Sequence, residues 1–141
     1  MEPLTPSRKM QARQMARYLA LQAIYAWQLS ENSLPQLMEY FLQEPETQEV
    51  DQAYFNQLVA GVIEHHVNLD QQLQPYVLRS LQGLDPVEKA LLRLALYELL
   101  YCPKVPYKVV INEAIELAKD FGAQDSHKFV NGVLDKLKTK A

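Results

Sequence analysis

Four basic residues near the start of the chain have a spacing that suits contacts with phosphate. Lys9, Arg13 and Arg17 are four residues apart, so they fall on one face of a helix, and Arg8 lies beside them. Positive charge in the first turns of a helix opposes its dipole, at a cost of up to about 1 kcal/mol for each charge. No acidic residue occurs between Arg8 and residue 30 to neutralise them. The cluster therefore predicts contacts with nucleic-acid phosphates, although a solvated basic face is the commoner role of such a run.

A second group of candidates lies in the segment GAQDSHKF at residues 122–129. Asp125 is expected to cap a helix, and Lys128 follows in its first turn, where backbone amides favour an anion. Phe129 has two interpretations: it continues the apolar stripe of that helix, or it stacks on an unpaired base beside Lys128. The pattern alone favours core packing for Phe129.

The sequence lacks the motifs of catalysis and metal binding. His65 and His66 are adjacent, so on a helix they point about 100° apart and cannot chelate one ion. Cys102 is the only cysteine and has no histidine near it in sequence, which favours a packing role over a nucleophilic one. There is no HExxH, no CxxC and no glycine-rich phosphate loop. The sequence therefore predicts a protein that is not an enzyme and that needs neither a cofactor nor a metal.

Helices must position these candidates, because the apolar periodicity predicts six helices and no strand. The expected helices cover, within about two residues, 7–30, 33–43, 51–73, 85–101, 106–122 and 125–137. The clearest start signal is Asp85 followed by Pro86 and Glu88, which is a capping box with proline in the first helical position.

Three glycines carry specific expectations. Gly122 is expected to end the fifth helix in a left-handed conformation. Gly61 and Gly132 lie inside predicted helices, where glycine costs roughly 1 kcal/mol relative to alanine. A neighbouring helix that approaches closely is the expected reason for both.

The composition indicates a single domain of 141 residues whose net charge of −3 is unevenly distributed. Eight acidic residues and no basic ones lie between Tyr18 and Leu78, after the basic start. A single cysteine cannot form an internal disulfide, which favours a reducing compartment. No apolar run is long enough for a membrane span or resembles a signal peptide. The expected location is the cytoplasm.

Three blocks of sequence resemble the NusB family of transcription antitermination proteins. They are ALQAIYAWQLSEN at 20–32, DPVEKALLRLALYELLY at 85–101 and VPYKVVINEAIELAKDFGAQDSHKFVNGVLDKL at 105–137. Three such blocks in this order are far more specific than any short motif. The resemblance covers nearly the whole chain and is weakest between about residues 33 and 80.

The resemblance implies a fold, a function and a set of partners. The implied fold is all-α, a compact bundle of about six to seven helices in two small sub-bundles, near residues 7–80 and 84–140, that share one core. The implied function is antitermination: with NusE, a small-subunit ribosomal protein, the family binds the boxA element of nascent RNA, notably in ribosomal RNA operon leaders. NusA, NusG and RNA polymerase are the further implied partners, and some members form homodimers.

The resemblance also assigns residues. Arg13 and Arg17 match basic positions of the family's arginine-rich segment, and Arg8 and Lys9 extend that segment upstream. Gln14 and Met15 occupy positions where further arginines are typical, so the segment is thinner in this chain.

Four more positions carry family roles. Phe129 matches an aromatic residue that the family places against RNA, and Asp125 matches a position on the same surface. Tyr25 and Glu88 match positions that are tied to assembly with NusE and RNA, although Glu88 also completes the capping box. Lys128, beside Phe129, completes the expected RNA-binding set.

Two alternatives stay open on the sequence alone. The first is a helical adaptor that binds only proteins, with the basic end as a solvated arm. The second is a substrate-binding region like the NusB-like part of some ribosomal RNA methyltransferases, which the absence of a following cofactor-binding domain disfavours. A hydrolase is a distant third, because no candidate base or nucleophile is present.

Overall fold

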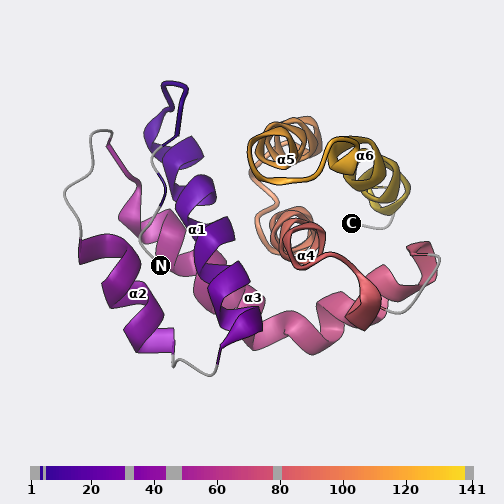
Figure 1. Cartoon of the computed structure of the whole chain (residues 1–141), viewed down its shortest axis with the longest axis horizontal. Helices are drawn as coiled ribbons and strands as arrows, with labels where there is room; N and C mark the ends of the chain where they lie inside the picture. Colours follow the sequence, from indigo (N-terminus) through magenta and orange to yellow (C-terminus); the bar gives the residue numbers. More distant parts are fainter. Residues whose placement is uncertain (1–3, 5, 31–33, 44–48, 78–80, 139–141) are drawn as a thin grey trace.

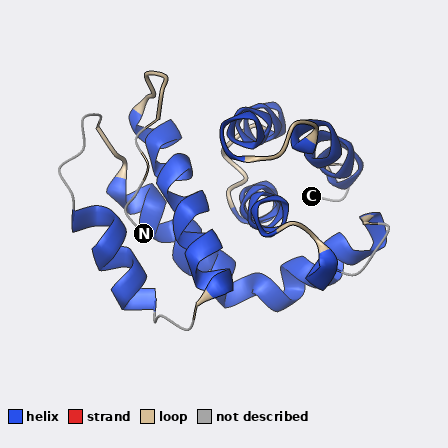
Figure 2. Ribbon diagram, viewed as in Figure 1, coloured by secondary structure: helices blue, strands red, loops and turns tan. Residues whose placement is uncertain are grey.

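The fold is built from α-helices alone within the residues that the structure, a computed structural model, describes: 4, 6–30, 34–43, 49–77 and 81–138. Figure 1 shows the helices in chain order. They are α1 (Ala12–Leu29), α2 (Leu34–Gln43), α3 (Gln52–Leu73), α4 (Pro86–Tyr101), α5 (Tyr107–Phe121) and α6 (Ser126–Leu137), with short 3₁₀ turns at Gln74–Tyr76 and Leu81–Gly83. Figure 2 shows the same helices joined by loops. The predicted all-α class is confirmed.

Two groups of helices pack on each other, and α4 contacts both α1 and α3 of the first group. In Figure 1, α1 and α2 lie to the left and α4, α5 and α6 to the right, while α3 runs along the lower edge from the first group to below α4. One hydrophobic core runs through both groups. Every residue from Met15 to Ile24 of α1, and from Ala90 to Glu98 of α4, is buried. A helix that is apolar all round must be covered on several sides, which explains why these two lie in the centre. The division into sub-bundles near residues 80–84 stays a prediction.

The helix starts follow local chemistry where a cap is present. The Asp85 carboxylate accepts hydrogen bonds from the backbone N–H groups of Val87 and Glu88, at 2.8 and 3.3 Å, so the predicted start of α4 is confirmed. The first helix begins later than predicted. It starts at Ala12 and not near residue 7. Gln11 is its N-cap residue, and the Gln14 side chain accepts a hydrogen bond from the N–H of Gln11.

The glycine predictions have three different outcomes. Gly61 is confirmed as a close-packing position, because a Cβ there would overlap the ring of Tyr97. Gly122 has a φ of −84°, so the predicted left-handed cap is wrong. A Cβ at Gly122 would instead lie 2.6 Å from the Ser126 side chain and 2.7 Å from the Ala118 carbonyl oxygen. Gly132 has open space around it, so the close approach predicted there is wrong.

Gly61 and Gly132 form a matched pair of tests. Gly61→Ala forces the Tyr97 ring to move and is expected to lower the free energy of unfolding by about 1–3 kcal/mol. Gly132→Ala adds a methyl group to an exposed position of α6 and is expected to raise it by about 0.5–1 kcal/mol. Urea unfolding of both variants measures the two values. Equal effects at the two positions would contradict the close packing at Gly61.

Candidate nucleic-acid interface

Arg17 is a core residue and not part of the basic surface. Its side chain is 4% exposed, and its Nε atom donates to both carboxylate oxygens of Glu98 at 2.8 and 3.1 Å. Tyr54 donates its hydroxyl to the same carboxylate at 2.5 Å. Burial alone would lower the pKa of Arg17, but the hydrogen bond and the charge of Glu98 outweigh it and raise that pKa. The prediction that Arg17 presents its charge to phosphates is therefore wrong.

Arg13 and Lys9 keep their charges at the surface. The Arg13 side chain is 52% exposed and lies over the Tyr54 ring, 4.2 Å from the ring centre, with the Asp51 carboxylate 3.8 Å away. Lys9 is exposed and precedes α1. The predicted single helix face of Lys9, Arg13 and Arg17 is therefore wrong, because one of the three lies before the helix and another lies inside the core.

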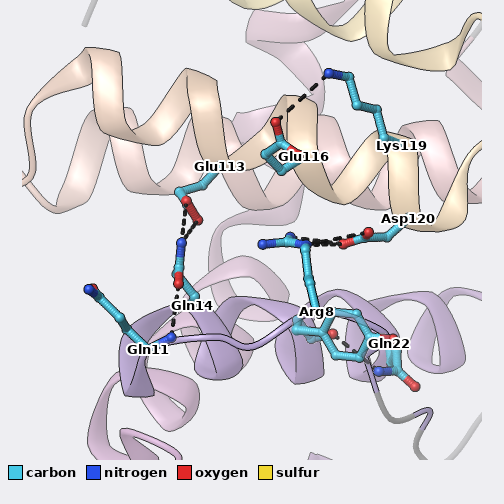
Figure 3. A network of polar contacts seen from close by, with 9 residues as sticks. Arg8, Gln11, Gln14, Gln22, Glu113, Glu116, Lys119 and Asp120 are labelled. Atoms are coloured by element: carbon cyan, nitrogen blue, oxygen red, sulfur yellow. Dashed lines mark hydrogen bonds and ion pairs between the residues drawn. The ribbon is translucent and has the colours of Figure 1, made fainter.

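Arg8 is held against α5. Its guanidinium donates to the Asp120 carboxylate at 2.9 Å, and this hydrogen bond raises the pKa of Arg8. Figure 3 shows the contact, together with the Gln14 amide, which donates to both oxygens of Glu113 at 3.0 Å. The predicted basic cluster assumed that Arg8 has no acidic partner, because none occurs between it and residue 30. The partner instead comes from 112 residues further along the chain.

A cleft of about 250 Å³ lies where the start of α1 meets the start of α5. From α1 and its cap it is lined by Gln11, Arg13, Gln14 and the buried Arg17, and from α5 by Glu113. Lys104, which is exposed in the connection between α4 and α5, lines the opposite side. Sequence reasoning missed Lys104, and the only signal was its position between two prolines, which places it in a surface loop.

The start of α6 holds the second predicted group. Lys128 and Asp125 have side chains that are 73% and 72% exposed, and their charged groups lie 3.5 Å apart. Asp125 is the N-cap residue of α6, as predicted, but its side chain makes no hydrogen bond to the backbone of the helix, so the expected side-chain cap is wrong. Phe129 is half-buried: it packs against the core and keeps part of its ring accessible. The structure thus bears out the core-packing interpretation of Phe129, and its contact with RNA stays a prediction.

Glu88 joins the starts of two helices. Its carboxylate accepts a hydrogen bond from the Ser126 hydroxyl at 2.8 Å, so the side chain links α4 to α6 instead of completing the predicted capping box. Ser126 is 3% exposed. Glu88 itself is half-buried and keeps some accessible surface.

Tyr25 lines an apolar pocket of about 140 Å³. The other lining residues are Leu4, Leu21, Gln22, Val87 and Phe121. Val87 directly precedes Glu88 in α4, so the structure brings the two predicted partner-binding residues to one region, the start of α4.

Neither a metal-binding cluster nor a membrane-spanning helix occurs in the described part of the chain. No three His, Cys, Asp or Glu residues within it are grouped so that they could hold a metal ion. No helix of the described residues is long and apolar enough to cross a membrane. Charged and aromatic side chains on a rigid helical core define a binding protein, in which exposed cations and an apolar pocket offer surfaces to other macromolecules.

Comparison with known proteins identifies the family. The NusB family model matches residues 14–139. The transcription antitermination protein NusB of Shewanella amazonensis is 58% identical over 125 residues, which cover 89% of this chain and 93% of that one. The NusB of Proteus mirabilis is also 58% identical, over 89% and 91% of the two chains. The chain therefore belongs to the NusB family of transcription antitermination proteins, and its function is not catalytic.

Solved structures agree with this assignment. NusB of T. maritima has a TM-score of 0.82 and 31% identity, with 94% of each chain covered. A crystal structure of the antitermination factors NusB and NusE in complex with double-stranded RNA has a TM-score of 0.84 and 26% identity, over 92% of this chain and 98% of that one.

Proposed function

We propose that this chain binds the boxA element of nascent RNA together with NusE, and that the pair helps RNA polymerase to read through terminators. The observation that carries the proposal is the similarity to a NusB chain crystallised with NusE and RNA. NusA, NusG and the polymerase are the further proposed partners, and the cytoplasm, where transcripts are made, is the proposed location. The homodimer that the family resemblance implies stays a prediction, which sedimentation can check.

The proposed RNA surface uses the basic residues that the structure leaves accessible. The cleft at the start of α1 is lined by Arg13 and Lys104, and the exposed Lys9 precedes the same helix. We propose that these three side chains contact phosphates. Arg8 joins them once it leaves Asp120. Arg17 also lines this cleft, but its side chain is 4% exposed and its charge is paired with Glu98, so we assign it no phosphate contact.

The start of α6 is the proposed site of base contacts. The accessible part of the Phe129 ring can stack on an unpaired base, while Lys128, whose ion pair with Asp125 is solvent-exposed, can approach a neighbouring phosphate. Asp125 lies on the same surface, where its carboxylate can accept hydrogen bonds from a base edge. Tyr25 and Glu88 are proposed to contact NusE.

The test is binding to a single-stranded boxA-like RNA at physiological salt, with and without NusE. We expect a preference over a scrambled RNA of the same length, and a duplex of the same sequence is measured beside it because the related complex holds double-stranded RNA. NusE should strengthen binding, because two proteins that share one RNA raise each other's effective concentration. Phe129→Ala should weaken boxA binding about 5- to 150-fold, which corresponds to the loss of about 1–3 kcal/mol of stacking.

The alternative of a purely protein-binding module makes the opposite prediction. In that case the chain binds NusE, while its affinity for boxA RNA equals that for the scrambled RNA in every mixture. An unchanged affinity in Phe129→Ala would separately remove that residue from the RNA surface.

A further inference from the structure

The segment before α1 folds back along that helix. We call its described residues, Leu4 and 6–10, the N-terminal arm. The N–H of Leu4 donates to the Gln22 side-chain oxygen at 2.8 Å, while Gln11, at the other end, caps α1. Gln11 and Gln22 are about 16 Å apart along a helix. Seven extended residues can span up to about 24 Å, so the arm covers this length without strain.

Further contacts of the described residues seat the arm between α1 and α5. Leu4 forms one wall of the apolar pocket at Tyr25. Arg8 pairs with Asp120 of α5, as Figure 3 shows, and Met10 is 6% exposed against the core. Gln22 is itself held, because its amide donates to the Tyr18 carbonyl at 3.3 Å.

The outer end of the arm is held weakly. Leu4 is 55% exposed, so it gains only part of the burial free energy of a leucine. The side chains of Arg8 and Asp120 are 30% and 21% exposed, and ion pairs of this kind contribute about 0–1 kcal/mol. The match to the family model begins at residue 14, so the arm lies outside the segment that the family model describes. The residues of the arm that precede Met10 can therefore dissociate from α1 and α5 without unfolding α1.

The position of the arm connects the two proposed binding surfaces. Its apolar end covers the pocket at Tyr25, beside the residue proposed to contact NusE together with Glu88. Its basic residue, Arg8, is proposed to contact RNA but is paired with Asp120 in this structure. Neither surface is fully accessible while the arm is seated.

We propose that the N-terminal arm is a latch that competes with NusE for the apolar pocket lined by Leu21, Tyr25, Val87 and Phe121. This inference rests on the proposed function. An RNA phosphate that takes Arg8 away from Asp120 removes one of the arm's anchors, and the pocket then opens to an apolar side chain of NusE. RNA and NusE therefore strengthen each other's binding through the arm, in addition to sharing one RNA segment.

The experiment releases the arm without touching either proposed binding surface. Asp120→Asn removes the anchor of Arg8, and Leu4→Ser removes the apolar contact. Without RNA, each variant should bind NusE about three- to tenfold more tightly than the unaltered chain. The reason is that each substitution removes roughly 1 kcal/mol of contacts between the arm and its site, and the arm competes with NusE for that site. Asp135→Asn makes the same charge change on α6, at the ion pair with Lys138, and should leave NusE affinity unchanged.

Two further readouts make the test decisive. The backbone amide of Leu4 should exchange its hydrogen faster in Asp120→Asn, because its bond to Gln22 opens more often. With saturating boxA RNA, the NusE affinities of the unaltered chain and of Asp120→Asn should converge, because the latch is already open.

Each contrary outcome has a definite meaning. If the unaltered chain binds NusE and both variants bind it equally well or more weakly, the latch is overturned and the proposed function stands. If neither the unaltered chain nor the variants bind NusE, the NusE part of the proposed function fails and the latch fails with it. Binding of NusE by the variants alone would support the latch in its strongest form.

Discussion

Replacing Glu98 with alanine is expected to lower the free energy of unfolding by about 3–5 kcal/mol, because it leaves the charge of Arg17 buried without its partner. Arg17 and Glu98 are 4% and 2% exposed, so water cannot replace the lost carboxylate unless the core opens. The hydroxyl of Tyr54 also loses its acceptor. Urea unfolding followed by circular dichroism measures the change.

The matched control removes both charges together. Arg17→Met with Glu98→Leu replaces the ion pair by apolar side chains of similar size, and such exchanges are often neutral or stabilising. The double variant should therefore be several kcal/mol more stable than Glu98→Ala. It should also bind boxA RNA as well as the unaltered chain does. A loss of RNA affinity in a folded double variant would return Arg17 to the RNA surface and contradict the role assigned to it here.

The sequence predicted those features whose causes are local. The start of α4 was predictable because Asp85 and Pro86 act within one turn of the helix they begin. The burial of α1 and α4 also has a local cause, because most of their residues are apolar around the whole circumference. Gly61 followed from the cost of glycine inside a helix, although the sequence could not name Tyr97 as the reason.

The errors at Arg17 and Arg8 concern charges whose partners are far away in sequence. A spacing of four residues placed Arg17 beside Arg13, but this spacing says nothing about which neighbour covers that part of α1. Glu98 lies 81 residues further on, in a helix whose buried face gives no sign that it carries a charge inward. Arg8 was treated as unpaired for the same reason, since only the packed structure brings Asp120 to it.

Glu88 shows how one side chain can satisfy a sequence pattern and still act elsewhere. The capping box predicts a bond from Glu88 back to its own helix, and Asp85 alone provides the cap that is observed. The carboxylate of Glu88 instead reaches Ser126, because α6 begins beside α4 in the folded chain. At the start of α4, a residue that fits a capping pattern therefore makes a tertiary contact with another helix.

Neutralising Lys9, Arg13 and Lys128 together, each by glutamine, is expected to weaken boxA binding about 50-fold at physiological salt. Each contact with a phosphate of single-stranded RNA adds about 0.7 to the slope of log affinity against log salt, so the three should lower that slope by about 2. If the three contacts contribute nothing at 1 M salt, a slope change of 2 amounts to about 50-fold at 0.15 M. Fluorescence titration at several salt concentrations measures both quantities.

The control for this variant has the same net charge. Lys119, Lys136 and Lys138 lie on α5 and at the end of α6, outside the proposed RNA surface, and their replacement by glutamine should change the slope little. The comparison matters because the chain carries a net charge of −3, so any loss of positive charge increases its general repulsion of RNA. Equal losses in the two triple variants would mean that RNA senses only the overall charge. A loss of RNA affinity confined to the Lys9, Arg13 and Lys128 variant would assign the phosphate contacts to the starts of α1 and α6. Exposed cations there lie close to the aromatic and polar groups that can distinguish one base from another.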